Sequence, residues 1–153
     1  PKAEMLGAYT ASEKCSNAIG QLESGQGFIN AINGTLEVAN VSNNEIAVVK
    51  THGTGTRSNN QAEKSALENS LSGFIATSYK PTIGHTMGVS GLLETCLLLD
   101  SMKQGVVPKI ENRTEQDDVF LSQDREVTGG VVLSLAAGMG NVYSAALFYT
   151  RGQ

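Results

Sequence analysis

Residues 46–56 read IAVVKTHGTGT, and this stretch decides the fold. The apolar run at its start is typical of a β-strand that is covered on both faces. The strand leads directly into a glycine-rich loop that carries His52. Ser58 and Gln61 then have the spacing of a capping box, which predicts a helix that continues to about Ser70. A strand, a glycine-rich loop and a helix in this order form the repeating unit of an α/β layer.

The same order of elements returns further along the chain. Residues 74–78 are the next expected strand, and they lead into KPTIGH at residues 80–85, which carries His85. A third helix is expected from Ser90 to Gln104. It is apolar on most sides, which predicts that it lies buried at the centre of the molecule.

Three shorter apolar segments complete the expected sheet. One strand is predicted at residues 6–9, and two more are predicted at residues 131–135 and 142–149. The last two flank the turn Gly138-Met139-Gly140. Together with the two strands named above, they predict a mixed β-sheet of about five strands.

A further helix precedes the stretch that decides the fold. Apolar residues at helical spacing predict it over residues 26–40, with Ser24 as its N-cap. The sequence therefore predicts an α/β fold in which helices are layered on a mixed sheet. The length of 153 residues suits a single domain over residues 1–153.

Composition excludes several classes of protein. The chain has 11 basic and 15 acidic residues, a net charge of −4 and no basic stripe, which argues against a nucleic-acid partner. No apolar run approaches the roughly 18 residues that a membrane span requires. Cys15 and Cys96, the two cysteines, cannot form a disulfide framework. We therefore expect a protein of the reducing cytoplasm.

The chain has two histidines, and each lies between an expected strand and an expected helix. Because ligands of α/β layers bind at the carboxyl ends of strands, we expect His52 and His85 to lie close together. Two imidazoles could donate hydrogen bonds to a carbonyl oxygen that gains negative charge. Lys80 adds a positive charge five residues before His85, which could tune either histidine or hold a carboxylate. Glu63 is a candidate partner that orients this histidine network.

Two other interpretations were weighed for these residues. A single histidine in a turn is more often structural than catalytic, but both histidines here share one context. A metal site is less favoured because two histidines lack a third and fourth ligand at the usual spacing, so no bound metal is expected. Neither glycine cluster matches a phosphate-binding fingerprint.

The residues around both histidines resemble a known family. HGTGT at residues 52–56 and KPTIGHTMGVSG at residues 80–91 are similar to the two histidine motifs of β-ketoacyl-[acyl carrier protein] synthases. These are the decarboxylating condensing enzymes of fatty-acid and polyketide synthesis. GVVP at residues 105–108 and the glycine turn around Met139 resemble the segments that follow. The resemblance covers essentially the whole chain and implies the C-terminal half of a thiolase-like fold.

The resemblance implies a division of labour among the site residues. His52 and His85 would stabilise the enolate formed when a malonyl thioester loses carbon dioxide, and later the tetrahedral oxyanion. Lys80 would support the histidine network, and Glu63 would anchor it. The implied enzyme is an acyltransferase.

The resemblance also implies how substrates arrive. Thr54 and Thr56 match positions that hydrogen-bond the phosphopantetheine arm of an acyl carrier protein, so no cofactor would be bound directly. Asn60, expected to support the loop network, stands where the family usually has aspartate. Met139 stands where an aromatic gate usually lies beside the acyl pocket. These two departures put the acyl specificity in question.

The family's nucleophile is a cysteine in the N-terminal half of the fold, upstream of both histidine motifs. Cys15, followed by Ser16, faintly resembles that motif, but it lies in a polar stretch and no apolar strand leads into it. Cys96 lies on the leucine-rich helix, where we expect a packing role. We therefore expect this chain to be inert alone. The partners implied are an acyl carrier protein and an N-terminal half, in a homodimer or heterodimer.

A second hypothesis is a non-catalytic partner subunit, such as a chain-length factor or a structural pseudo-synthase. Both hypotheses predict that some leucines of the helix over residues 90–104 are exposed when the C-terminal half stands alone.

Overall fold

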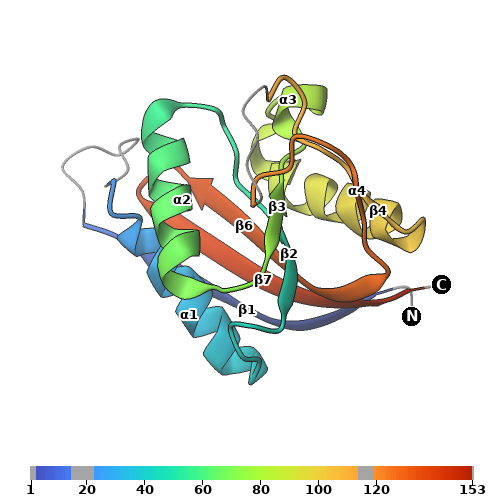
Figure 1. The fold of residues 1–153 in the computed structure, drawn as a ribbon. Helices are drawn as coiled ribbons and strands as arrows, with labels where there is room; N and C mark the ends of the chain where they lie inside the picture. Colours follow the sequence, from blue (N-terminus) through green and yellow to red (C-terminus); the bar gives the residue numbers. More distant parts are fainter. Residues whose placement is uncertain (1–2, 15–22, 114–118, 153) are drawn as a thin grey trace.

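The computed structural model describes residues 3–14, 23–113 and 119–152. These residues form a five-stranded sheet in the order β1-β7-β6-β2-β3, together with a small sheet of β4 and β5 (Figure 1). The predicted α/β fold with about five strands is therefore confirmed. The strands are β1 (Glu4–Ser12), β2 (Ile46–Lys50), β3 (Ile75–Thr77), β4 (Val106–Val107), β5 (Arg125–Glu126), β6 (Gly129–Gly138) and β7 (Val142–Arg151).

The large sheet is mixed, as predicted. β2 runs parallel to β3 and to β6, whereas β7 is antiparallel to both β6 and β1. Lys50, the last residue of β2, pairs with Thr77 on one side and Ser134 on the other. The carboxyl ends of β2 and β3 and the corresponding part of β6 therefore meet at one edge, where ligands of such sheets bind.

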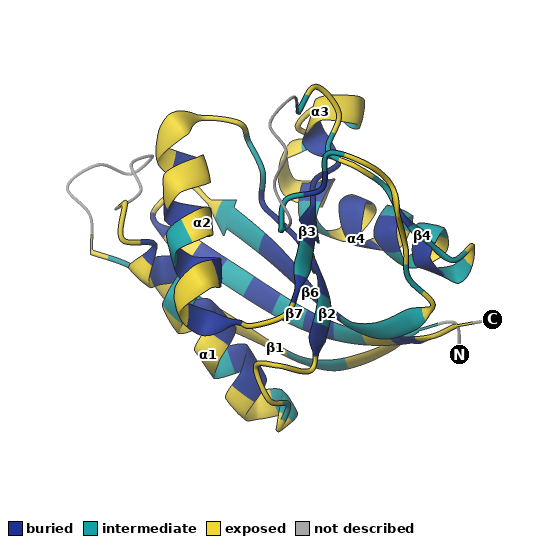
Figure 2. Ribbon diagram, viewed as in Figure 1, coloured by how far each residue is buried: buried dark blue, intermediate teal, exposed yellow. Residues whose placement is uncertain are grey.

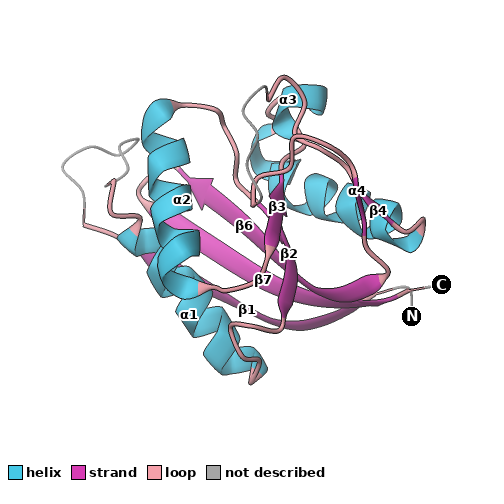
Figure 3. Ribbon diagram, viewed as in Figure 1, coloured by secondary structure: helices cyan, strands magenta, loops and turns pink. Residues whose placement is uncertain are grey.

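Helices cover both faces of the sheet (Figures 1 and 3). α1 and α2 pack on one face, and α4 packs on the other. Of the helices in the described ranges, none has the length and apolar character needed to cross a bilayer. The helices are α1 (Gln26–Ala39), α2 (Arg57–Ser70), α3 (Lys80–Ile83), the 3-10 helix η1 (Met87–Val89) and α4 (Ser90–Lys103).

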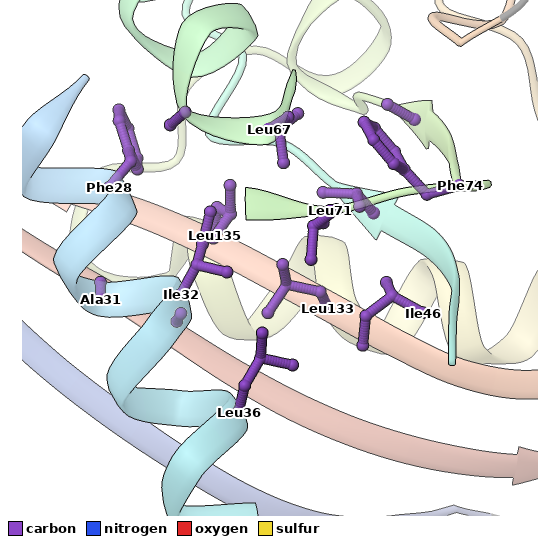
Figure 4. Packing of buried hydrophobic residues seen from close by; sticks show 14 of the residues in the cluster. Phe28, Ala31, Ile32, Leu36, Ile46, Leu67, Leu71, Phe74, Leu133 and Leu135 are labelled. Atoms are coloured by element: carbon purple, nitrogen blue, oxygen red, sulfur yellow. The ribbon is translucent and has the colours of Figure 1, made fainter. Parts of the chain in front are cut away.

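The core lies in two layers because neighbouring residues of a strand point to opposite faces. Leu133 and Leu135 of β6 pack with Ile32 and the other buried residues of α1 and α2 (Figure 4). Val132, the neighbour of Leu133 in the strand, belongs to the cluster on the other face together with Leu98 of α4. Figure 2 shows the outward sides of α1 and α2 exposed and β2 largely buried, whereas much of β1 at the edge of the sheet is exposed. This two-sided burial explains the continuous apolar run of β2.

The starts of α1 and α2 differ from the prediction. Ser24 is not the N-cap of α1, because Gly25 takes that position with a φ of 69° and without a side-chain cap. A Cβ atom on Gly25 would lie 2.1 Å from the carbonyl oxygen of Ala62, so α1 begins where it crosses α2 closely. Ser58 does not cap α2 either. Thr56 does, since its hydroxyl accepts a hydrogen bond from the Asn59 backbone N–H at 3.4 Å.

The prediction that the leucine-rich helix is buried at the centre is wrong for this chain. Leu98 and Met102 are buried beneath α4, but Leu92 is 67% exposed. One side of α4 covers the sheet, and its other side is left open in the described part of the chain. The expectation of exposed leucines is thereby confirmed. Cys96 is also exposed, so its expected packing role is wrong within these residues.

The crossing of α1 and α2 gives a test of the fold. We expect Gly25→Ala to lower the free energy of unfolding by more than 2 kcal/mol, since the new methyl group adds a clash to an unfavourable φ. Gly73 has a φ of 71° with open space around it, so Gly73→Ala is the matched control and should cost about 1–2 kcal/mol. Urea denaturation measures both variants. Equal losses would contradict the close crossing.

Candidate functional site

His52 and His85 lie together at the carboxyl edge of β2 and β3. His52 follows β2 by two residues, and His85 follows α3, the short helix entered from β3. Their ring centroids are 5.7 Å apart, and the ring planes meet at 84°. His52 is buried and His85 is exposed. The prediction that the two imidazoles meet is confirmed, and one member of the pair is open to solvent.

The backbone of the loop after β2 is held by Glu63 of α2. The buried carboxylate accepts hydrogen bonds from the backbone N–H groups of His52 and Gly53 and from the side-chain amide of Asn59 at 2.7 Å. Burial raises the pKa of Glu63, and these three donors oppose that rise. Gly53 has a φ of 59°, and a Cβ there would lie 2.1 Å from Ser78 Oγ. Glu63 therefore fixes the loop through its main chain and not through the His52 ring.

Lys80 holds the other side of the same peptide. Its buried ammonium donates a hydrogen bond to the backbone carbonyl of His52 and another to Glu94 Oε1 at 2.7 Å. The hydroxyl of Ser90 donates to the same Glu94 oxygen. Lys80 thus contacts the histidine network through the main chain and connects it to α4.

Lys50 and Glu94 belong to this site, and the sequence reasoning missed both. Lys50 Nζ lies 3.5 Å from Glu94 Oε2 and donates a hydrogen bond to the carbonyl of Leu135 at 2.7 Å. Both side chains are completely buried. Burial lowers the pKa of Lys50 to about 8. The available signal was a charged residue at the end of an apolar strand and another within a leucine-rich helix.

The environment of His52 keeps its ring neutral at physiological pH. Burial, followed by the nearby charges of Lys80 and Lys50 and by His85, lowers the pKa of His52 to about 3. A neutral imidazole carries one N–H donor. Such a donor can stabilise an oxyanion by a hydrogen bond, without the strong acidity of an imidazolium.

The remaining predicted site residues come from the loop after β2, from α2 and from the turn between β6 and β7. Thr54 is half-buried and Thr56 exposed, with their hydroxyls 3.4 Å apart. Asn60 is exposed and lines a cavity of about 650 Å³ between α2 and the segment that follows β4. Met139 is 76% exposed in the turn between β6 and β7. Of the described residues that line this cavity, none is a histidine or Met139. The cavity therefore contains Asn60 but not the histidine pair or Met139.

The described residues place no cysteine beside the histidines. Cys96 is exposed on α4, and Cys15 lies outside the described residues. In the same ranges, no three histidine, cysteine, aspartate or glutamate side chains gather as metal ligands would. The chemistry that the described site offers is therefore hydrogen bonding by two imidazoles above a buried charge network.

Comparison with known proteins assigns the family. The family described as "Beta-ketoacyl synthase, C-terminal domain" matches residues 2–114, and this chain belongs to it. The tetracenomycin polyketide synthase ketoacyl synthase alpha subunit of Streptomyces glaucescens is 30% identical over 154 residues. That match covers 95% of this chain and 36% of the relative. The chain thus spans little more than a third of the length of this relative.

Solved structures agree with the family and with its thiolase-like fold. A β-ketoacyl synthase from Burkholderia phymatum STM815 superposes with a TM-score of 0.87 at 26% identity, over 99% of this chain and 38% of that chain. The ishigamide ketosynthase/chain length factor has a TM-score of 0.85 at 24% identity, again over 99% of this chain and 38% of that one. The second likeness concerns the fold alone.

The buried neutral state of His52 predicts how stability depends on pH. In the unfolded chain His52 binds its proton near pH 6.5, whereas the folded chain resists it down to about pH 3. Stability should therefore fall as the pH drops from 6.5 towards 3, by up to about 1.4 kcal/mol per pH unit from this residue. His52→Asn should lose that part of the slope. Urea denaturation from pH 7.5 to 4 measures it.

Measurements above pH 7 are the control for the comparison of the wild type with His52→Asn. Above pH 7 the unfolding curves of the wild type and of His52→Asn should differ by a constant amount only, because His52 is then neutral in both states. Parallel stability curves all the way down to pH 4 would show that His52 takes up its proton as readily in the folded chain as in the unfolded one.

Proposed function

We propose that this chain is the C-terminal half of a β-ketoacyl synthase, an acyltransferase that joins malonyl and acyl thioesters by decarboxylative Claisen condensation. The observation that carries the proposal is the pair of imidazoles at 5.7 Å, one of them buried and neutral. The reaction passes through two oxyanions, and neutral N–H donors stabilise such charges. The family membership supports the same class of reaction.

In the first half of the reaction, the bond between the malonyl carboxylate and its α-carbon breaks. Carbon dioxide leaves, and the electron pair is shared by the α-carbon and the thioester oxygen as an enolate. His52 and His85 donate hydrogen bonds to that oxygen. Shielding from water matters here, because a proton from water would end the reaction at the α-carbon.

In the second half, the enolate carbon attacks an acyl thioester on a cysteine that the N-terminal half supplies. A carbon–carbon bond forms, and the carbonyl oxygen becomes a tetrahedral oxyanion that the histidines also stabilise. The oxyanion collapses, the carbon–sulfur bond breaks, and the electron pair returns to the cysteine sulfur. Lys80 and Glu63 act in both halves by fixing the His52 backbone.

Both substrates arrive on the phosphopantetheine arm of an acyl carrier protein in this proposal. Thr54 and Thr56 present hydroxyls at the mouth of the loop, where they can hydrogen-bond the amides of that arm. Met139 would border the acyl chain with a flexible side chain, and Asn60 would support the loop without a charge. The tetracenomycin relative supports polyketide rather than fatty-acid synthesis.

A second candidate function is that of a chain-length factor, a partner subunit without its own condensing activity. Asn60 and Met139 favour it, since both depart from the pattern of the synthases. The retained histidine pair favours the catalytic function. The residue at the nucleophile position of the N-terminal half distinguishes the two.

The proposal is tested by producing this chain together with a synthase N-terminal half that carries the nucleophilic cysteine. The assay measures carbon dioxide released from a malonyl-acyl carrier protein. We expect His52→Ala and His85→Ala each to lower the rate about 10²–10³-fold, because each removes one donor to the enolate oxygen.

Glu37→Gln is the control for this assay, since Glu37 is exposed on α1, away from the site. It should retain the full rate. Full activity in either histidine variant would refute the assigned roles. Two results would favour the chain-length factor. One is that this chain releases no carbon dioxide together with a cysteine-bearing N-terminal half. The other is that exchanging this chain in an active synthase changes the length of the product.

A further inference from the structure

Four buried ionisable side chains surround the His52 end of β2. Lys50 comes from β2, Lys80 from α3, Glu63 from α2 and Glu94 from α4. Two positive and two negative groups therefore lie in one poorly solvated region. Unbalanced charge in such a region acts strongly on its neighbours, because little solvent screens it.

The two carboxylates are held in different ways. Glu63 accepts hydrogen bonds from two backbone N–H groups and an amide, and no lysine forms a salt bridge with it in the described residues. Glu94 takes Lys80 on Oε1 and Lys50 on Oε2. Lys80 alone would balance Glu94, so Lys50 is the cation that offsets the remaining negative charge.

We propose that Lys50 is a positioning residue that balances the charge beneath the two histidines, so that an anion can be held between them. Without Lys50 the buried network would carry one net negative charge next to a site that must bind an enolate or oxyanion. The inference rests on the proposed function. The hydrogen bond from Lys50 to the Leu135 carbonyl fixes the ammonium in place and connects it to β6, the strand that leads to Met139.

The electrostatic effect of Lys50 can be measured without any substrate. A positive charge near His52 opposes protonation of the imidazole, and the same field favours an anion in the same place. Loss of the charge should therefore make His52 easier to protonate. His52 thus reports the field that the enolate would experience.

Lys50 must be protonated to act in this way. The pKa of Lys50 is lowered to about 8. Burial is the main cause, the charge of Lys80 adds to the fall, and Glu94 and Glu63 oppose it. Among the described residues, the ionisable groups that interact with Lys50 are these three side chains, from α3, α4 and α2, and the His52 ring in the loop after β2. Lys50 is thus charged at pH 7 and loses its charge as the pH rises through about 8.

The first test is histidine NMR on this chain, which has two histidines and hence two ring signals to assign. In Lys50→Met we expect the ratio of imidazolium to imidazole at His52, measured at pH 4–5, to rise about tenfold. Glu94→Gln added to Lys50→Met removes one negative charge and should restore the wild-type ratio. Lys109→Met is the matched control, because Lys109 is an exposed lysine paired with Glu111, and it should change nothing.

An unchanged ratio in Lys50→Met overturns the inference, whatever the activity of the chain. If Lys50→Met does not fold, the wild-type chain provides the same test by titration. The Lys50 Cε signal should titrate near pH 8, and the His52 ring signals should shift with the same midpoint. A His52 ring that does not respond to that titration also overturns the inference.

The second test uses the chain together with a cysteine-bearing N-terminal half. Lys50→Met should lower kcat for decarboxylation about tenfold with little change in KM, because the charge acts on the developing anion. The wild-type rate should decline above pH 8, and Lys50→Met should lack that decline. A shifted His52 ratio in a protein without condensing activity would support the role of Lys50 and count against the proposed function.

Discussion

The site depends on the buried ion pairs that Glu94 forms with Lys80 and Lys50. The Glu94 carboxylate receives Lys80 and Ser90 on one oxygen and faces Lys50 across 3.5 Å on the other. Through these contacts α4 is joined to α3 and to β2, and through Lys50 to the Leu135 carbonyl of β6. Burial of charged groups gives little net stability, so the network is better explained by what it does for the loop above it.

That loop is clamped through its main chain. Lys80 donates a hydrogen bond to the carbonyl of His52, and Glu63 accepts hydrogen bonds from the N–H groups of His52 and Gly53. Both contacts are made to the backbone of His52, so neither Lys80 nor Glu63 uses its imidazole. Burial, and after it the charges of Lys80 and Lys50, lowers the pKa of His52, which keeps the ring a neutral donor.

The sequence was informative where local pattern determines structure. The apolar run of β2 and the glycine loops predicted that the two histidine loops follow strands and converge at their carboxyl ends, and hence that His52 meets His85. It was uninformative where distant residues decide the outcome. The pairing of Lys50 with Glu94 joins residues from β2 and α4, and no spacing rule connects them.

The errors in detail have similar causes. Gly25 replaces the expected cap Ser24 because α1 crosses α2 there, which is a tertiary constraint. α4 was expected at the centre because its composition is apolar, but composition cannot say which layer covers the second side of a helix. The exposed Leu92 marks that uncovered side.

The most direct test of this account is the protonation state of His52 in the unmodified chain. Nitrogen NMR of ¹⁵N-labelled histidine at pH 5 distinguishes a neutral ring, with one protonated nitrogen, from an imidazolium, with two. The account predicts a neutral His52 at pH 5, well below the ordinary pKa of histidine. An imidazolium at that pH in the folded chain would contradict it.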